Sequence, residues 1–244
     1  MILSDLIGAG ILMAYYLGIV VLLPTLLRIR TKVRFEIVRK LQHVGYSLSI
    51  FLLLRLFSSW YMAIAAAFLL VVLAYPALWA MEKSAWYQRT FVDRTARGGE
   101  LRKQLLYAQL SFAALIALFW GLLGTRWQYI VALSVVPWGF GDAAAALVGK
   151  AWGRRHVLLR FVDSAKTYEG TLAMILVAGL ALFLTLLFYA HQPWHVSLLI
   201  SILVAPVCGL VELFSRRGTD TLTVPLSTGL AILPLLSLFA VLGW

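Results

Sequence analysis

The chain has 244 residues and a mass of 27.2 kDa; 62% of its residues are hydrophobic, only 13% are charged, and the mean hydropathy is +0.91. A soluble domain carries about 25% charged residues, so the composition excludes a water-soluble protein, a disordered chain, a coiled coil and a collagen-like fibre. The net charge of +11 therefore indicates basic loops facing anionic lipid and the cytoplasm, and we expect no nucleic-acid partner.

A helix that spans the membrane needs about 20 mainly apolar residues. The segments that meet this requirement are, in chain order, Leu6–Leu27, Trp60–Ala80, Leu105–Leu123, Tyr129–Val148, Thr171–Ala190, Val196–Phe214 and Pro225–Leu242. A shorter segment, Val44–Phe57, contains Arg55 and can cross if that side chain extends to the interface. The sequence predicts an all-α, polytopic membrane protein with about eight transmembrane helices, in one domain that covers residues 1–244.

The basic residues lie in alternate loops. Nineteen of the 21 Lys and Arg residues fall within residues 28–40, 83–103, 150–166 and 216–217, and the remaining two are Arg55 and Arg126. The positive-inside rule then predicts that both termini are on the non-cytoplasmic side. Nine of the ten acidic residues share the basic side, whereas Asp5 lies opposite and is expected to cap a helix. Carboxylates among basic groups predict a metal–phosphate site at the cytoplasmic membrane surface.

The first candidate stretch precedes the second span. Arg39, Lys40 and His43 are three or four residues apart, so one helical face presents all three to the membrane boundary. The two cations could bind phosphate, and His43 could take a proton from an alcohol. The alternative is that they are ordinary flanking and interfacial residues.

The second stretch runs from Pro137 to Gly149. Asp142 is a carboxylate at membrane depth, which is costly and usually functional. Gly141 precedes it, and Gly149 lies seven residues on, on the same helical face, where a phosphate or metal could approach the backbone. The alternative role for Asp142 is a structural pair with an arginine.

Two further stretches lie on the same predicted side. In the loop before the sixth span, Ser164 or Thr167 could cap a helix whose N-terminus binds an anion, with Lys166 adding a charge. A plain capping arrangement would also explain Glu169. Later in the chain, Glu212 and Asp220 lie eight residues apart across a turn, which suits Mg²⁺.

In chain order these stretches resemble the CTP-dependent lipid-alcohol kinases, which include the phytol, farnesol and dolichol kinases and the fungal CTP-using diacylglycerol kinase. The matching pieces are Arg39-Lys40-x-x-His43, Gly141-Asp142-x-x-Ala145-x-x-x-Gly149, Lys166-Thr167-x-Glu169-Gly170 and Asp220-Thr221-Leu222-Thr223-Val224-Pro225. The family often has Asp-Asn before the Leu-Thr-Val-Pro run, whereas here Thr221 follows Asp220. The length of the chain is similar to that of the phytol and farnesol kinase branch.

The resemblance implies Mg²⁺-assisted phosphorylation, at the cytoplasmic surface, of a membrane-embedded alcohol such as phytol, geranylgeraniol, farnesol or a polyprenol, with CTP as donor. The expected catalytic residues are Asp142, His43 and Lys166. The expected nucleotide- and phosphate-binding residues are Arg39, Lys40, Arg97, Gly141, Gly149, Arg154, Arg155, Lys166 and Gly170. The expected metal ligands are Asp142, Glu169, Glu212 and Asp220.

Three alternatives stay open at this point. Phosphatidate cytidylyltransferases share a Lys-x-x-Glu-Gly stretch similar to Lys166–Gly170, but their later Lys-Arg and Asp-rich signature is not found after Glu169. A CTP-dependent diacylglycerol kinase would use the same motifs on another alcohol. A non-enzymatic lipid carrier or transporter would place its polar residues near the bilayer midplane, often in repeated halves, and this chain does neither.

Overall fold

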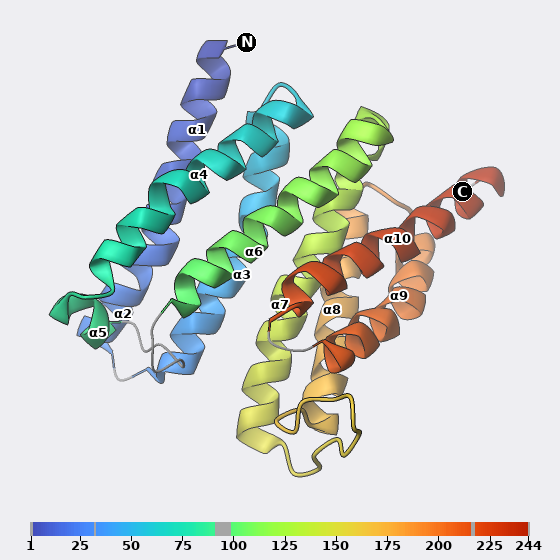
Figure 1. Cartoon of the computed structure of the whole chain (residues 1–244). Helices are drawn as coiled ribbons and strands as arrows, with labels where there is room; N and C mark the ends of the chain where they lie inside the picture. Colours follow the sequence, from blue (N-terminus) through green and yellow to red (C-terminus); the bar gives the residue numbers. More distant parts are fainter. Residues whose placement is uncertain (1, 32, 91–98, 216–217, 244) are drawn as a thin grey trace. The chain divides into compact units, whose positions relative to one another are not determined.

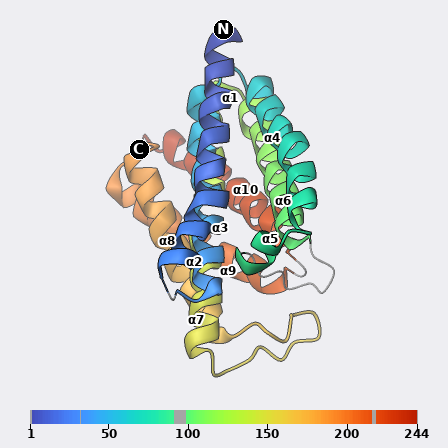
Figure 2. The ribbon, with the colours of Figure 1, turned by 90° about the vertical axis from the view of Figure 1, so that its left-hand side faces the viewer.

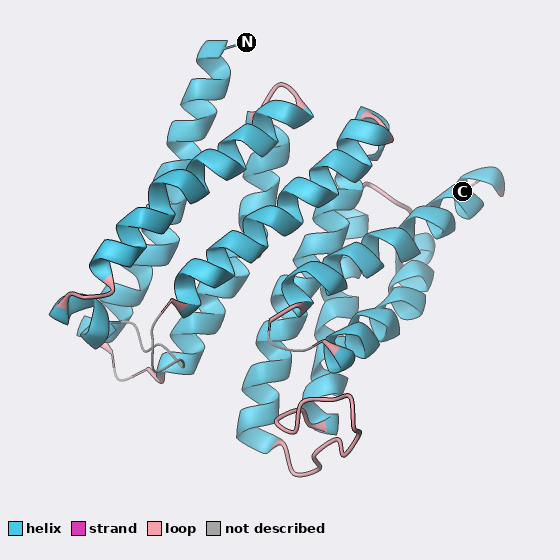
Figure 3. Cartoon of the chain, viewed as in Figure 1, coloured by secondary structure: helices cyan, strands magenta, loops and turns pink. Residues whose placement is uncertain are grey.

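The computed structural model describes residues 2–31, 33–90, 99–215 and 218–243, and nearly all of these residues are helical. No strand is found in these ranges, as Figure 3 shows. The helices are α1 (Ile2–Tyr16), η1 (Leu17–Leu22), α2 (Leu23–Arg30), α3 (Phe35–Leu56), α4 (Trp60–Met81), α5 (Ala85–Thr90), α6 (Glu100–Leu115), η2 (Ile116–Leu122), η3 (Thr125–Trp127), α7 (Tyr129–Trp152), α8 (Tyr168–Phe188), α9 (Trp194–Phe214) and α10 (Asp220–Val241). The predicted all-α class is confirmed.

Seven helical segments of the described chain are long and apolar enough to cross a membrane. They are Leu3–Arg30, Trp60–Met81, Leu101–Leu122, Thr125–Trp152, Tyr168–Phe188, Trp194–Phe214 and Asp220–Val241. These segments confirm a polytopic helical membrane protein. Helix α3 is also 22 residues long, but the charges near its start keep it out of this set. Its crossing, and the orientation of the termini, stay predictions.

The contacts within the chain gather in two compact units, Met1–Leu122 and Leu123–Trp244, whose helices are labelled in Figure 1. The sequence predicts a single domain, which stays a prediction. The carboxylates Asp142, Glu169, Glu212 and Asp220 all belong to the second unit, whereas Arg39, Lys40 and His43 belong to the first.

In the first unit, buried polar side chains join three helices. The Tyr16 hydroxyl at the end of α1 lies 2.7 Å from the Ser49 hydroxyl of α3, and the Gln109 side-chain amide of α6 donates to it at 2.6 Å. Inside a bilayer no water replaces such partners, so these bonds satisfy polar groups that would otherwise be costly to bury.

Asp5 has a different role from the one the sequence predicts. It lies inside α1 rather than before it, and its carboxylate accepts hydrogen bonds from the backbone N–H of Ser58 at 2.9 Å and from the Ser58 hydroxyl at 3.0 Å. The expected N-cap is therefore wrong. Asp5 instead accepts the hydrogen bonds of two polar groups in the turn between α3 and α4. This contact depends on how α1 packs against that turn.

The second unit is a closed set of four helices. Helix α7 packs against α8 and α10, and α9 packs against both α8 and α10. A Cβ built on Gly141 of α7 would lie 2.5 Å from the Met174 sulfur and 3.0 Å from the Ala178 methyl of α8. The two helices therefore pack closely at Gly141, where a larger residue would displace the Met174 side chain. Pro137 lies within α7, which continues past it.

Candidate functional site

The loop between α7 and α8 brings its two ends together. His156 and Thr167 form an isolated antiparallel bridge. The N–H of Val157 donates to the Lys166 carbonyl at 3.0 Å, and the N–H of Tyr168 donates to the Arg155 carbonyl at 3.0 Å. The predicted phosphate-binding residues Arg154 and Arg155 are thereby held beside the first turn of α8, with exposed side chains.

Two apolar residues anchor this loop to the helices. Val157 and Val162 form a buried cluster with Leu213 near the end of α9. Figure 2 shows the loop, in yellow, running sideways from the end of α7 before it returns to α8. The sequence analysis does not predict this anchoring. Two valines within an otherwise basic loop are the feature that could have indicated it.

The first turn of α8 has the cap that the sequence predicts. The buried Thr167 is the N-cap, and its hydroxyl oxygen accepts a hydrogen bond from the Gly170 N–H at 3.1 Å. Of the two predicted candidates, Thr167 and not Ser164 caps the helix. The positive end of the α8 dipole therefore lies next to Lys166, where an anion would be stabilised.

Three glycines allow the ends of α7 and α8 to touch. A Cβ on Gly149 would lie 3.1 Å from the Thr167 hydroxyl oxygen, and one on Gly170 would lie 2.9 Å from the carbonyl oxygen of Ala145. A Cβ on Gly153 would lie 2.7 Å from the Thr167 methyl group. Gly149 and Gly170 thus serve helix contact in this structure, and their predicted role toward phosphate stays a prediction.

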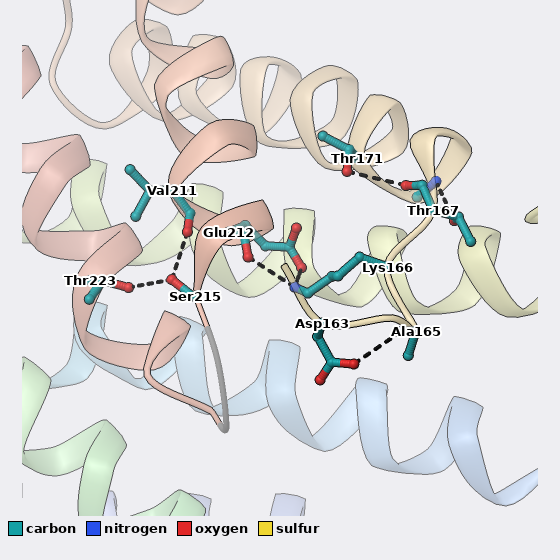
Figure 4. A network of polar contacts seen from close by, with 10 residues as sticks. Asp163, Ala165, Lys166, Thr167, Thr171, Val211, Glu212, Ser215 and Thr223 are labelled. Carbon is teal, nitrogen blue, oxygen red and sulfur yellow. Dashed lines mark hydrogen bonds and ion pairs between the residues drawn. The ribbon is translucent and has the colours of Figure 1, made fainter. Parts of the chain in front are cut away.

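Lys166 and Glu212 join the loop to α9. The Lys166 ammonium donates to the backbone carbonyl of Glu212 at 2.9 Å and forms an ion pair with the Glu212 carboxylate (Figure 4). The Glu212 side chain is only 5% exposed and that of Lys166 is 24% exposed. A predicted metal ligand and a predicted phosphate ligand are therefore in direct contact, although 46 residues separate them.

The other predicted carboxylates lie on the remaining three helices. Glu169, in the first turn of α8, accepts a hydrogen bond from the Arg155 N–H at 3.4 Å. Asp142 lies within α7 and Asp220 begins α10, and both side chains are partly buried. Each helix of the four-helix unit therefore contributes one carboxylate of the predicted set.

A ready metal centre is not present in the described part of the chain, where no three His, Cys, Asp or Glu side chains gather. Mg²⁺ commonly takes one or two carboxylates and completes its shell with phosphate oxygens and water. Carboxylates suit such a partly hydrated Mg²⁺, but its binding by Asp142, Glu169, Glu212 and Asp220 stays a prediction.

The turn between α9 and α10 carries a bond that the sequence did not indicate. The Ser215 hydroxyl lies 2.7 Å from that of Thr223, which belongs to the Leu-Thr-Val-Pro run, and donates to the Val211 carbonyl at 2.6 Å. These contacts, visible in Figure 4, hold the start of α10 against the end of α9, beside Glu212.

The remaining predicted residues belong to the N-terminal half of the chain. On α3, Arg39 pairs with Glu36 at 2.5 Å, and Lys40 is buried. His43 lies on the same helix. Because these three residues belong to the first unit, their participation in one site with Lys166 stays a prediction. Arg97 lies outside the described residues.

Comparison with known proteins finds a relative that matches almost the whole chain. The chain is 34% identical over 225 residues to a phytol kinase of Synechocystis sp., and the match covers 90% of this chain and 88% of the relative. No protein-family profile and no solved structure matches the chain.

Proposed function

Because the chain belongs to the phytol kinase family of lipid-alcohol kinases, we propose that it transfers the γ-phosphoryl group of CTP to the hydroxyl of an isoprenoid alcohol. Phytol is the acceptor that the name of its relative suggests, and geranylgeraniol, farnesol and polyprenols share the same chemistry. The alcohol's tail lies in the bilayer and its hydroxyl at the membrane surface. The basic loops support a cytoplasmic position for the site.

The observation that carries this proposal is the contact between Lys166 and Glu212. The Lys166 ammonium has the charge needed to bind a phosphate, and the Glu212 carboxylate has the charge needed to bind Mg²⁺. The contact therefore brings a candidate ligand for each ion to one place. On nucleotide binding, Lys166 would bind a phosphate oxygen in place of the carboxylate, and Glu212 would then be one of the residues that could hold the metal. The pair keeps both groups positioned and neutralised in the meantime.

Mg²⁺ would neutralise the negative charge of the nucleotide's phosphates. We assign its binding to Asp142 together with one or more of Glu169, Glu212 and Asp220. No further protein ligands are required, because the phosphate oxygens and water complete the shell.

The remaining positive charge acts on the transferred phosphoryl group. Lys166, Arg154, Arg155 and Arg97 stabilise the charge that develops on its oxygens. The capped first turn of α8 adds the positive end of a helix dipole beside Lys166. Arg39 and Lys40 steer the phosphates, and the hydroxyl proton passes to His43 or Asp142.

The experiment uses the purified full chain in lipid nanodiscs with γ-labelled CTP, Mg²⁺ and a panel of phytol, geranylgeraniol, farnesol, a polyprenol and diacylglycerol. Labelled isoprenoid phosphate supports the proposal, and labelled phosphatidic acid alone would identify a diacylglycerol kinase. Pyrophosphate release with a CDP-lipid would identify a cytidylyltransferase, and no reaction with any acceptor would favour a carrier.

Three controls test the phosphoryl donor, the metal and a substitution outside the proposed site. γ-Labelled ATP replaces CTP in one arm, and equal transfer from ATP would overturn the CTP assignment. EDTA in another arm is expected to stop transfer, and added Mg²⁺ is expected to restore it. Lys103→Ala, which removes an exposed cation of α6, is expected to leave the rate unchanged.

A further inference from the structure

The loop between α7 and α8 exposes three large apolar side chains outside any helix. Leu158, Leu159 and Phe161 are 88%, 51% and 67% exposed; we name these three residues the apolar tip. On either side of them, Val157 and Val162 are buried against Leu213. Of its five large apolar residues, the loop therefore buries two and leaves three exposed.

The loop holds this arrangement through defined contacts. Its ends are joined by the His156–Thr167 bridge, and its return carries backbone hydrogen bonds from Val162 to Leu159 and from Lys166 to Asp163. The two valines pack on Leu213 of α9, and the bridge joins the start of the loop to its end beside α8. The loop is therefore folded, and the apolar tip is exposed in this folded conformation.

Basic and aromatic residues surround the apolar tip. Arg160 lies within it, and Arg154 and Arg155 precede it; all three are exposed. Trp152 at the end of α7 and Tyr168 at the start of α8 are 70% and 58% exposed. Trp and Tyr at helix ends mark the level of the lipid headgroups, so both ends of the loop lie at this level.

We propose that the apolar tip inserts into the headgroup region of the leaflet at which α7 ends, with Arg160 bound to anionic lipid phosphates. Exposed apolar side chains interspersed with arginines are what an interfacial membrane contact requires: the apolar groups leave water, and the cations meet the negative surface. Figure 2 shows the loop running sideways from α7, so the inserted tip would hold the loop, and with it Lys166, against the membrane surface. This inference does not depend on the identity of the phosphoryl donor or acceptor.

A single fluorescent label tests it. Cys208 is the chain's one cysteine and is buried, so Cys208→Ala gives a background in which Leu158→Cys carries an environment-sensitive dye. Ser164→Cys, at an exposed position between Asp163 and Ala165 in the same loop, is the matched control. The proteins are placed in zwitterionic nanodiscs and in nanodiscs containing anionic lipid, each with and without lipid spin-labelled at the headgroup.

The proposal expects blue-shifted emission from the dye at position 158, quenching by the spin-labelled lipid, and a larger effect with anionic lipid. The dye at position 164 should emit as in water in every nanodisc. Arg160→Glu should remove the gain from anionic lipid while the labelled loop stays folded.

Three results would overturn it. Water-like emission at position 158 would mean that the apolar tip stays in solvent. Blue-shifted emission without quenching by spin-labelled lipid would mean that protein covers it, from this chain or a second copy. Equal quenching in zwitterionic and anionic nanodiscs would remove the role of Arg160.

Discussion

The Lys166 ammonium bonds both the main-chain carbonyl and the carboxylate of Glu212. Lys166 ends the α7–α8 loop and Glu212 lies in the last turn of α9, so one side chain fixes the loop to a neighbouring helix. The same two residues are candidate ligands for phosphate and metal. Structural and catalytic roles therefore coincide here, and variants must separate them.

Single and double variants of this pair give the first prediction. Lys166→Met leaves the Glu212 charge buried without its cation, so the melting temperature in detergent should fall. Removing one partner of a fully buried pair costs about 3–5 kcal/mol, and the partial exposure of Lys166 makes the cost smaller. Transfer activity should fall about 10²–10³-fold, as for loss of a group that stabilises the transition state.

The double variant Lys166→Met/Glu212→Gln should regain most of the lost melting temperature, because no buried charge is left unpaired, yet it should stay inactive. Recovery of activity together with stability would show that the pair acts only in folding.

Gly170 should not tolerate a side chain. A methyl group there would lie 2.9 Å from the backbone oxygen of Ala145, and neither backbone can move freely. Gly170→Ala should destabilise the protein by about 1–3 kcal/mol, measured by chemical unfolding in mixed micelles. Gly10→Ala is the matched control, since nothing lies within 4 Å of that position on α1. Equal stability of the two variants would refute the close contact of α7 and α8.

The Thr167 cap gives a test with a conservative variant. Thr167→Val keeps the shape of the side chain but removes the oxygen that accepts from the Gly170 N–H. Loss of such a cap costs about 0.5–2 kcal/mol, and the KM for the nucleotide should rise because Lys166 is the preceding residue. Thr167→Ser retains the acceptor and should retain both properties. If Val and Ser behave alike, the cap does not position Lys166.

Asp142→Asn should abolish transfer in the labelled-CTP assay while the protein elutes from size exclusion as the wild type does. The amide preserves size and much of the hydrogen bonding but is a poor Mg²⁺ ligand. Asp163→Asn is the matched control, because Asp163 lies in the exposed loop, where its side chain accepts a hydrogen bond from the Ala165 N–H at 3.0 Å. Substantial activity in Asp142→Asn would remove this residue from the mechanism.

His43→Ala should lower the rate less than Asp142→Asn does. A loose phosphoryl-transfer transition state needs little proton removal from the attacking hydroxyl, so the loss should stay near or below ~10²-fold, the lower end for acid–base groups. His191→Asn serves as a control, because His191 is exposed and has a φ of 52°, which Asn tolerates. A complete loss on His43→Ala would make His43 indispensable to the reaction.

The class of protein and most of its spans could be determined from the sequence, because hydropathy and segment length are local properties of the chain. Seven of the eight predicted spans correspond to apolar helices. The eighth, in α3, combines charged and apolar stretches, so composition alone does not decide whether it crosses. The Thr167 cap joins residues only three apart in the chain, so the sequence also predicts Thr167 as one of two candidate caps.

The partners of individual polar residues were decided only by tertiary structure. Lys166 meets Glu212, and Asp5 meets Ser58 rather than its own helix end, because helices far apart in sequence pack side by side. The same packing, and no local pattern, places Gly149 against Thr167 and Gly170 against Ala145. A sequence supplies the side chains that can bind phosphate or metal; the distances between them come from the packing of α7, α8 and α9.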